Sequence, residues 1–217
     1  MATHADVQLS FFEYRAAYRE PMSSTQTLYT EMPQIVLRAL KEWNVGLENV
    51  AYRQNATNLG EVSVTFGLFG GRIGFTVGLG SASLVVKDPN WSETELVARI
   101  CKAGLTAVVE SGDVVIAQQR ATITMHLRPR LGQIRDFVAR VIRPSDGVLT
   151  GPDIKAYGFS VYREDCSWVV DASVLYPSAL FIRIERGVAP SVPFAEIANL
   201  LRKEETDLLG LLGLEVA

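Results

Sequence analysis

The sequence predicts an α+β fold made of duplicated β-α-β4-α units, in which helices pack on one face of antiparallel sheets. Four segments carry apolar residues at the spacing of amphipathic helices, and between them apolar and polar residues alternate as in half-buried strands. The same order of elements is read over residues 11–111 and again over 114–214. The chain is therefore expected to divide into halves 1–112 and 113–217 that form one unit with pseudo-two-fold symmetry.

The first half is expected to open with a strand and a helix. Alternating residues mark the strand: Phe12, Tyr14, Ala16 and Tyr18. The helix should begin near Thr30, because Pro33 then falls in its first turn, where a missing backbone N–H does no harm. Its apolar stripe follows helical spacing: Met32, Ile35, Val36, Ala39, Leu40 and Trp43.

Four strands and a second helix should follow. The strands are marked by apolar residues over 50–52, 62–68, 73–79 and 84–86. Gly70-Gly71 predicts a two-residue hairpin turn of the primed type. Ser92 is the expected N-cap of the helix, with Glu95 completing a capping box, and Gly112 suits its end.

The second half repeats this order with one strand fewer. A strand through Ile123 and Leu127 precedes a third helix, which stops at Pro144, and a fourth helix begins near Pro193. The strands between these helices are expected over 157–161, 170–174 and 180–184. The missing strand could lie at Val148-Leu149 or within the run 168–176.

This tandem order resembles two known architectures. One is the TATA-box-binding-protein-like fold, in which helices cover one face of a curved antiparallel sheet. The other is the helix-grip fold, which cradles apolar ligands. The stretch Gly60-Glu61-Val62-Ser63-Val64 and the closing strand and helix are also similar to a sporadically distributed family of uncharacterised bacterial proteins. That resemblance implies no known activity, and a fold alone does not fix a function.

Composition sets the broad class of the protein. The 217 residues are 48% hydrophobic and 21% charged, as in an ordinary globular chain. The net charge of -3 disfavours nucleic-acid binding, which usually needs a basic footprint. The N-terminus lacks a signal-peptide pattern, and no apolar run approaches the ~20 residues that span a bilayer. We therefore expect a cytoplasmic protein without a membrane partner.

No catalytic or metal-binding pattern stands out, so a protein without a cofactor or metal is expected. The histidines are His4 and His126, and neither a Gly-x-Ser-x-Gly elbow nor the spacing of a Cys/His metal site accompanies them. Cys101 lies on the apolar stripe of the second helix. Cys166 falls in an expected turn, where acidic neighbours disfavour a thiolate, and carboxylates such as Glu204 are interpreted as solvated charge.

The sheet faces away from the helices should decide what the protein binds. In the first half this face carries small residues: Ser63, Thr65, Gly67, Gly74, Thr76, Gly78 and Gly80. Glycine weakens a strand interior, so their number favours close packing against this face. The other half of the chain, a second copy in a homodimer, a partner protein or a flat ligand would each fit.

The corresponding face of the second half is richer in polar groups. Tyr162, Asp171, Arg183 and Glu185 are the candidate ligand-binding residues, because neighbouring antiparallel strands could gather the last three into a charge cluster. The alternative is a solvated face of mixed charge.

A basic segment lies between the halves. It contains Arg120, Arg128, Arg130, Arg135, Arg140 and Arg143. Arg128 and Arg130 are the candidates for contact with phosphate or an acidic partner. Alternatively, these arginines pair with acidic residues of the same chain, or complement the dipole at the end of the third helix.

These observations together favour a non-enzymatic binding or protein-interaction module. The alternative is a carrier or enzyme with an apolar pocket between sheet and helix, motivated by the helix-grip resemblance and by aromatic strand residues such as Phe66 and Phe75. Nucleic-acid binding by the open sheet ranks third, because the exposed strand positions offer few cations.

Overall fold

A computed structural model of the chain describes residues 3–54, 62–130 and 158–216. These residues form two compact units, each drawn from separate stretches of sequence. Unit 1 combines Met1–Phe11, Thr122–Arg186 and Leu200–Ala217, and unit 2 combines Phe12–Ala121 and Gly187–Asn199. The expected division of the chain near residue 112 stays a prediction.

Four elements supply residues to both units: β1 (Thr3–Tyr18), β6 (Ile116–Pro129), β9 (Leu180–Val188) and α4 (Phe194–Leu212). Each unit is described below with its own part of these elements. Over the described residues, none of the helices is both long and apolar enough to cross a membrane.

Unit 2 contains a sheet with the strand order β2-β3-β4-β5-β1-β6. Its complete strands are β2 (Val50–Arg53), β3 (Ser63–Leu68), β4 (Ile73–Gly78) and β5 (Ser81–Lys87), which pair in antiparallel fashion. Buried and half-buried residues alternate along β3, β4 and β5, so one face of the sheet is packed and the other meets solvent.

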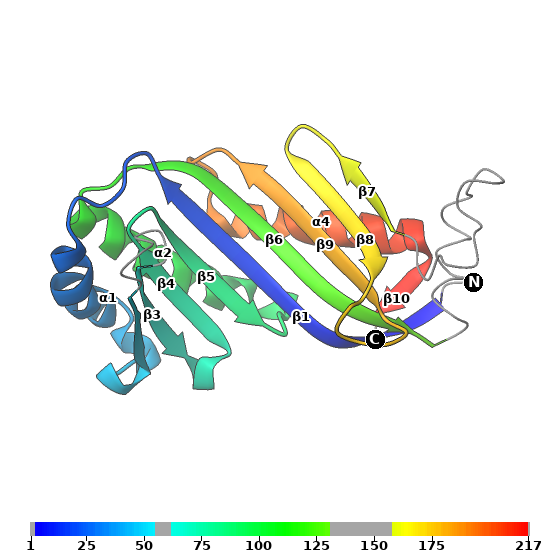
Figure 1. Cartoon of the computed structure of the whole chain (residues 1–217), viewed down its shortest axis with the longest axis horizontal. Coiled ribbons are helices and arrows are strands. Elements are labelled where there is room, and N and C mark those ends of the chain that lie inside the picture. The colour runs from blue at the N-terminus through cyan, green and yellow to red at the C-terminus, as the bar shows by residue number, and fades with distance from the viewer. Residues whose placement is uncertain (1–2, 55–61, 131–157, 217) are drawn as a thin grey trace. The chain divides into compact units, whose positions relative to one another are not determined.

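Helix α2 (Thr94–Gly112) passes behind the strands of unit 2 in Figure 1, on their packed face, and α1 (Met32–Ala39) packs against α2 at the left of the picture. Phe66 and Phe75 are paired across β3 and β4 and are fully buried beneath these helices. Short helical turns join the elements: Thr27–Glu31, Lys41–Trp43, Leu47–Asn49, Phe69–Gly71 and Trp91–Glu93.

Unit 1 contains a sheet with the strand order β1-β6-β9-β8-β7. Strands β7 (Phe159–Tyr162) and β8 (Cys166–Ala172) pair antiparallel with each other, and β8 pairs antiparallel with β9. The short strand β10 (Leu214–Val216) runs parallel to the start of β1, with Thr3 opposite Leu214. Leu201 and Leu208 of α4 are fully buried, so the unit-1 part of this helix packs on the sheet as in Figure 1.

The predicted α+β class, with antiparallel strands covered by helices, is confirmed. The first half also shows the expected order of one strand, a helix, four strands and a helix. The duplication and the likeness to TATA-box-binding or helix-grip folds stay predictions. The expected third helix, the strand start at Tyr157, and Arg135, Arg140 and Arg143 lie outside the described residues.

Three local expectations are wrong. Leu68 pairs with Ile73, so the hairpin loop has the four residues 69–72 rather than a two-residue turn at Gly70-Gly71. Phe69, with a φ of 51°, adopts the left-handed conformation together with Gly70 and Gly71. The turn is therefore longer than the two glycines alone. Cys166 opens β8 instead of lying in a turn. Strand β8 ends at Ala172, which leaves Val174 in the following loop with 97% of its surface exposed.

The start of α2 also differs from the expectation. The helix begins at Thr94, after a 3-10 turn, and Asn90 takes the capping role expected of Ser92. The Asn90 Oδ1 atom accepts a hydrogen bond from the backbone N–H of Ser92 at 3.0 Å. Asparagine is among the favoured N-cap residues, so the shift keeps the capping chemistry while moving its position. The helix ends at Gly112, as predicted.

The small-residue face of β3 and β4 is half-buried. The hydroxyl groups of Thr65 and Thr76, which are cross-strand partners, hydrogen bond at 2.9 Å. A Cβ atom at Gly78 would lie 3.3 Å from the carbonyl oxygen of Val62, whereas one at Gly80 would meet no described atom within 4 Å. Local backbone approach therefore accounts for Gly78, and a packed partner over this face stays a prediction.

Replacing Gly104 by alanine should destabilise unit 2. A Cβ atom at this position in α2 would lie 2.6 Å from Cζ of the buried Phe75 ring, so helix and sheet would have to separate. We expect Gly104→Ala to cost about 1–3 kcal/mol in the free energy of unfolding, measured by urea titration. The matched control is Gly210→Ala in α4, where the new Cβ meets nothing within 4 Å and should stabilise by about 0.5–1 kcal/mol. Equal effects of the two substitutions would contradict this account.

Candidate functional site

A buried polar bridge lies at the base of a groove in unit 2. The Tyr14 hydroxyl on β1 donates a hydrogen bond to Oε1 of Gln119 on β6. The Gln119 Nε2 group in turn donates to the carbonyl oxygens of Ala189 at 3.0 Å and Pro190 at 2.7 Å. Tyr14 and Gln119 are both buried, so this side-chain amide ties two strands to the segment that leads into α4.

The bridge fixes one wall of the groove. Nε2 of Gln119 also lies 3.2 Å from the carbonyl oxygen of Val192, so the carbonyls of segment 189–192 converge on one amide. An unpaired buried polar group costs about 1–3 kcal/mol, which favours keeping this arrangement closed. The polar atoms at the base of the groove are therefore occupied by one another rather than offered to a ligand.

The groove runs between α2 and segment 190–195, and its volume is about 490 Å³. Half-buried apolar side chains line it: Ala98, Leu105, Ile116, Val192 and Phe194. The charged lining residues are Glu95, Arg99 and Lys102, all exposed on α2. The groove thus combines an apolar wall with charges at its rim, which is the usual composition of a small-molecule site.

Two ionisable groups of the groove are held neutral. Burial raises the pKa of the Cys101 thiol and of the Tyr14 hydroxyl well above their usual ranges. Cys101 is fully buried, which confirms its expected place on the apolar stripe of α2. Neither group can supply an anion near neutral pH, so the base of the groove offers no activated nucleophile.

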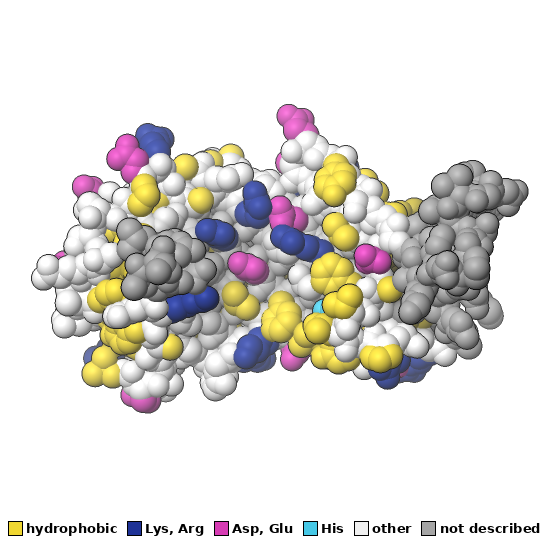
Figure 2. All heavy atoms as spheres, in the orientation of Figure 1, with side chains coloured by type: hydrophobic (Ala, Val, Ile, Leu, Met, Phe, Trp, Pro, Cys, Tyr) yellow, Lys and Arg dark blue, Asp and Glu magenta, His cyan; other side chains and the backbone are white. Residues whose placement is uncertain are grey.

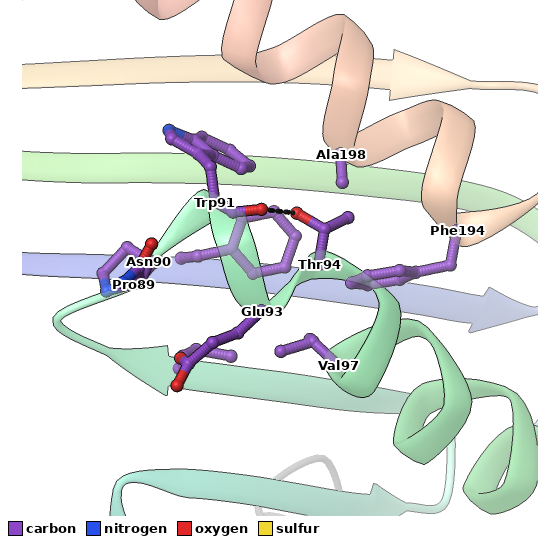
Figure 3. A pocket seen from close by; sticks show the side chains of 10 residues that line it. Pro89, Asn90, Trp91, Glu93, Thr94, Val97, Phe194 and Ala198 are labelled. Carbon is purple, nitrogen blue, oxygen red and sulfur yellow. Dashed lines mark hydrogen bonds between the residues drawn. The ribbon is translucent and has the colours of Figure 1, made fainter.

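A second hollow of unit 2 is almost filled by aromatic rings (Figure 3). Phe12 packs edge-to-face against Trp91 and Phe194, with ring centroids 6.4 and 5.6 Å apart. The Thr94 hydroxyl donates to the carbonyl oxygen of Trp91 at 2.7 Å. The remaining volume is about 20 Å³, enough for about one water molecule. This hollow between sheet and helices therefore holds no space for an organic ligand.

A third hollow, of about 550 Å³, separates α1 from α2. Arg99 lies on its border, where the guanidinium forms a 2.8 Å salt bridge with Glu42 and lies 5.9 Å from the Trp43 ring. Lys102 lines this hollow and the groove beside segment 190–195. Arg99 is therefore engaged on the α1 side of the helix.

The candidate ligand residues of the second half share the sheet face of unit 1 that points away from α4. The register pairs Tyr162 with Ser167, Ser167 with Glu185, Val169 with Arg183, and Asp171 with Phe181. Paired residues project from the same face of a sheet. Figure 2 shows hydrophobic, basic and acidic side chains intermingled over β8 and β9 on this face.

The expected three-residue charge cluster is only partly formed. Arg183 makes a 2.5 Å salt bridge with Glu185 along β9. Asp171 instead accepts a hydrogen bond from the backbone N–H of Ala172 at 2.7 Å, and over the described residues no salt bridge joins it to Arg183. Asp171 lies opposite Phe181, and Arg183 is two residues further along β9, opposite Val169. Asp171 and Arg183 are therefore diagonal rather than direct neighbours. Tyr162 is 77% exposed.

The sequence did not indicate that His126, a residue of this face, is buried. It projects from β6 and is only 4% exposed. Its Nδ1 atom is 2.8 Å from the Ser173 hydroxyl, and the rings of Tyr176 and Phe181 pack against it with centroids 5.4 Å away. The covering loop is distant in sequence, so no local pattern could reveal this burial.

The two candidate phosphate-binding arginines differ in their surroundings. Arg130 forms a salt bridge with Asp6, with a Nη2–Oδ1 distance of 2.6 Å, and this contact lowers the pKa of the Asp6 carboxyl. Arg128 is exposed and lowers the same pKa by a weaker electrostatic effect. Arg130 thus has a partner in the chain, as the alternative interpretation expected, and phosphate contact stays a prediction.

Glu204 is buried, which corrects its interpretation as solvated charge. It is 6% exposed and forms salt bridges with Arg163 at 2.5 Å and Arg186 at 2.6 Å. The Trp168 Nε1 group donates to the same carboxylate at 3.1 Å. Burial, with Glu204 as the next cause, raises the pKa of the nearby Cys166 thiol to about 11. The cluster therefore fixes α4 to β8 and β9 rather than activating the cysteine.

Comparisons with known proteins do not assign this chain to a family. The chain matches no protein-family model and no curated protein. A crystal structure of a candidate adenylate cyclase from Bacillus halodurans aligns over 92% of this chain and 91% of its own, with 8% identity and a TM-score of 0.16. A likeness at this level carries no argument about fold or function. In the part of the chain that the structure describes, no group of three or more His, Cys, Asp or Glu side chains could hold a metal.

The buried His126 should make unit 1 sensitive to acid. Burial lowers the pKa of its imidazole, so the unfolded chain takes up a proton before the folded chain does. Stability should therefore fall as the pH drops below about 6.5, which urea titrations above and below that pH would measure. His126→Gln should reduce this fall. His4→Gln, at a 60% exposed side chain, is the control and should leave it unchanged. An identical acid loss in all three proteins would show that other groups cause it.

Proposed function

We propose that this chain is a non-enzymatic binding module that takes a small, largely apolar ligand in the groove of unit 2. The observation that carries the proposal is the groove itself, with about 490 Å³ of space between α2 and segment 190–195. This volume falls within the range of about 300–1,000 Å³ that is usual for ligand pockets. The half-buried Leu105, Ile116 and Val192 would gain by contact with apolar ligand atoms.

The chemistry of the groove supports binding over catalysis. Its most buried ionisable side chains, Tyr14 and Cys101, have raised pKa values and stay protonated near neutral pH. A general base must instead be deprotonated at the working pH, with a pKa close to it. The bridge through Gln119 holds segment 189–192 in place, so the groove is formed before a ligand arrives. Preformed sites of this kind lose little free energy to ordering on binding.

A second candidate function is self-association through the open sheet face of unit 1. Three large side chains on this face and in the adjoining loop after β8 are strongly exposed: Tyr162 on the face, and Val174 and Leu175 in the loop, at 77%, 97% and 62%. The same face carries the charge pair of Arg183 and Glu185 together with the carboxylate of Asp171. Mixed charge beside apolar groups suits an interface with a second copy, because in a two-fold interface residue i of one copy contacts residue j of the other and the reverse, so a patch that carries both signs can complement itself. A cytoplasmic location is part of the same proposal.

The groove can be tested by filling it. Ala98 is a half-buried groove residue of α2, and a larger ring there would occupy the space of the ligand. We expect the native chain to bind 1-octanol in isothermal titration calorimetry, and Ala98→Phe to weaken that binding by at least about tenfold. Ala103→Phe is the matched control, since Ala103 lines only the hollow beside α1. Octanol binding that survives Ala98→Phe would place the ligand elsewhere.

Self-association can be tested separately by sedimentation equilibrium. Leu175→Asp places a charge within the exposed apolar group of unit 1 and should shift the chain from dimer to monomer. Leu211→Asp, at a 61% exposed position of α4, is the control and should leave the dimer intact. A native chain that sediments as a monomer, or a dimer that tolerates Leu175→Asp, would rule out this surface.

A further inference from the structure

We infer that the groove of unit 2 selects an amphipathic monocarboxylate, whose anionic head pairs with Lys102 while its apolar chain lies against Leu105, Ile116 and Val192. The inference rests on the proposed function and names the chemical class of its ligand. It depends on which polar groups of the groove are already engaged and which are left for a ligand.

The two buried polar side chains at the base of the groove, Tyr14 and Gln119, are already engaged. The Tyr14 hydroxyl donates to Gln119, and the Gln119 amide donates to the carbonyls of the opposite wall. Displacing any of these bonds would leave a buried polar group unpaired. A ligand that enters the groove therefore keeps its apolar part inside and must place its polar head at the rim.

The charge at the rim favours an anion. Two cations and one carboxylate line the groove, namely Arg99, Lys102 and Glu95. Glu95 lies in the first turn of α2, where the helix dipole already stabilises its negative charge. Arg99 is engaged by Glu42 at 2.8 Å and lies over the Trp43 ring, both on the side of α1.

Lys102 is the cation left available. It is exposed, it lines the groove, and over the described residues it takes part in no salt bridge. On α2 it lies four residues after Ala98 and three before Leu105, so these apolar groove residues are its neighbours on the helix surface. A lysine ammonium on its flexible stem can follow a carboxylate at the rim while its methylene groups cover the apolar chain below.

The test compares ligands that share one chain and differ in the head group. Octanoate, 1-octanol and octyltrimethylammonium would be titrated into the native chain by isothermal titration calorimetry. We expect octanoate to bind about fivefold more tightly than octanol, the scale of a partly exposed charge pair, and the cation to bind most weakly. Lys102→Met should abolish the preference for octanoate while preserving octanol binding. Lys102→Arg should retain the preference for octanoate. Lys203→Met, at an exposed position of α4 outside the groove, is the matched control.

The outcomes separate this inference from the proposed function. Equal binding of octanoate and octanol, both lost in Ala98→Phe, would leave the groove as the binding site and overturn the role of Lys102. A preference for octanoate that survives Lys102→Met but disappears in Arg99→Met would also overturn it, in favour of the arginine. Failure of all three ligands to bind would overturn the proposed function together with the inference.

Discussion

Burial of the helix-facing side of the strands is the constraint on which the rest of unit 2 depends. Phe66 and Phe75 are paired across β3 and β4 and are completely removed from water. Each such side chain contributes about 1.5–3 kcal/mol when it is buried. Gly104 lets α2 approach the Phe75 ring closely, because any larger side chain would meet the ring. The position of α2 is thus set by an aromatic contact, and α2 in turn supplies one wall of the groove.

In each unit a buried polar side chain is bonded to partners far away in sequence. In unit 2, Gln119 connects Tyr14 of β1 to the segment that precedes α4. In unit 1, the carboxylate of Glu204 on α4 receives Arg163, Arg186 and the Trp168 indole. Removing one partner from a buried ion pair costs about 3–5 kcal/mol, so these contacts constrain where α4 can lie. Within each unit these polar groups are engaged with one another, whereas Lys102 of α2 lies exposed at the rim of the groove.

The sequence alone determined the elements that depend on periodicity. Alternation along β3, β4 and β5 and the apolar stripe of α2 correspond to a packed and a solvated side in the structure. The open face of unit 1 was also foreseen, since Tyr162, Asp171, Arg183 and Glu185 share it. These features follow from the two-residue repeat of a strand and the 3.6-residue repeat of a helix, which local sequence records directly.

Tertiary structure decided everything that requires two distant segments to meet. His126 appears polar in its strand, yet the loop after β8 buries it, and Glu204 appears solvated until Arg163 and Arg186 close around it. The groove has the same origin, because α2 and segment 190–195 are brought together by the fold. The proposed role of Lys102 also depends on tertiary structure. Arg99 is engaged by Glu42 of the helical turn Lys41–Trp43, which leaves Lys102 as the available cation of the groove. Local sequence specifies which face a side chain occupies, whereas packing between distant segments decides whether that side chain is buried, paired or left available to a ligand.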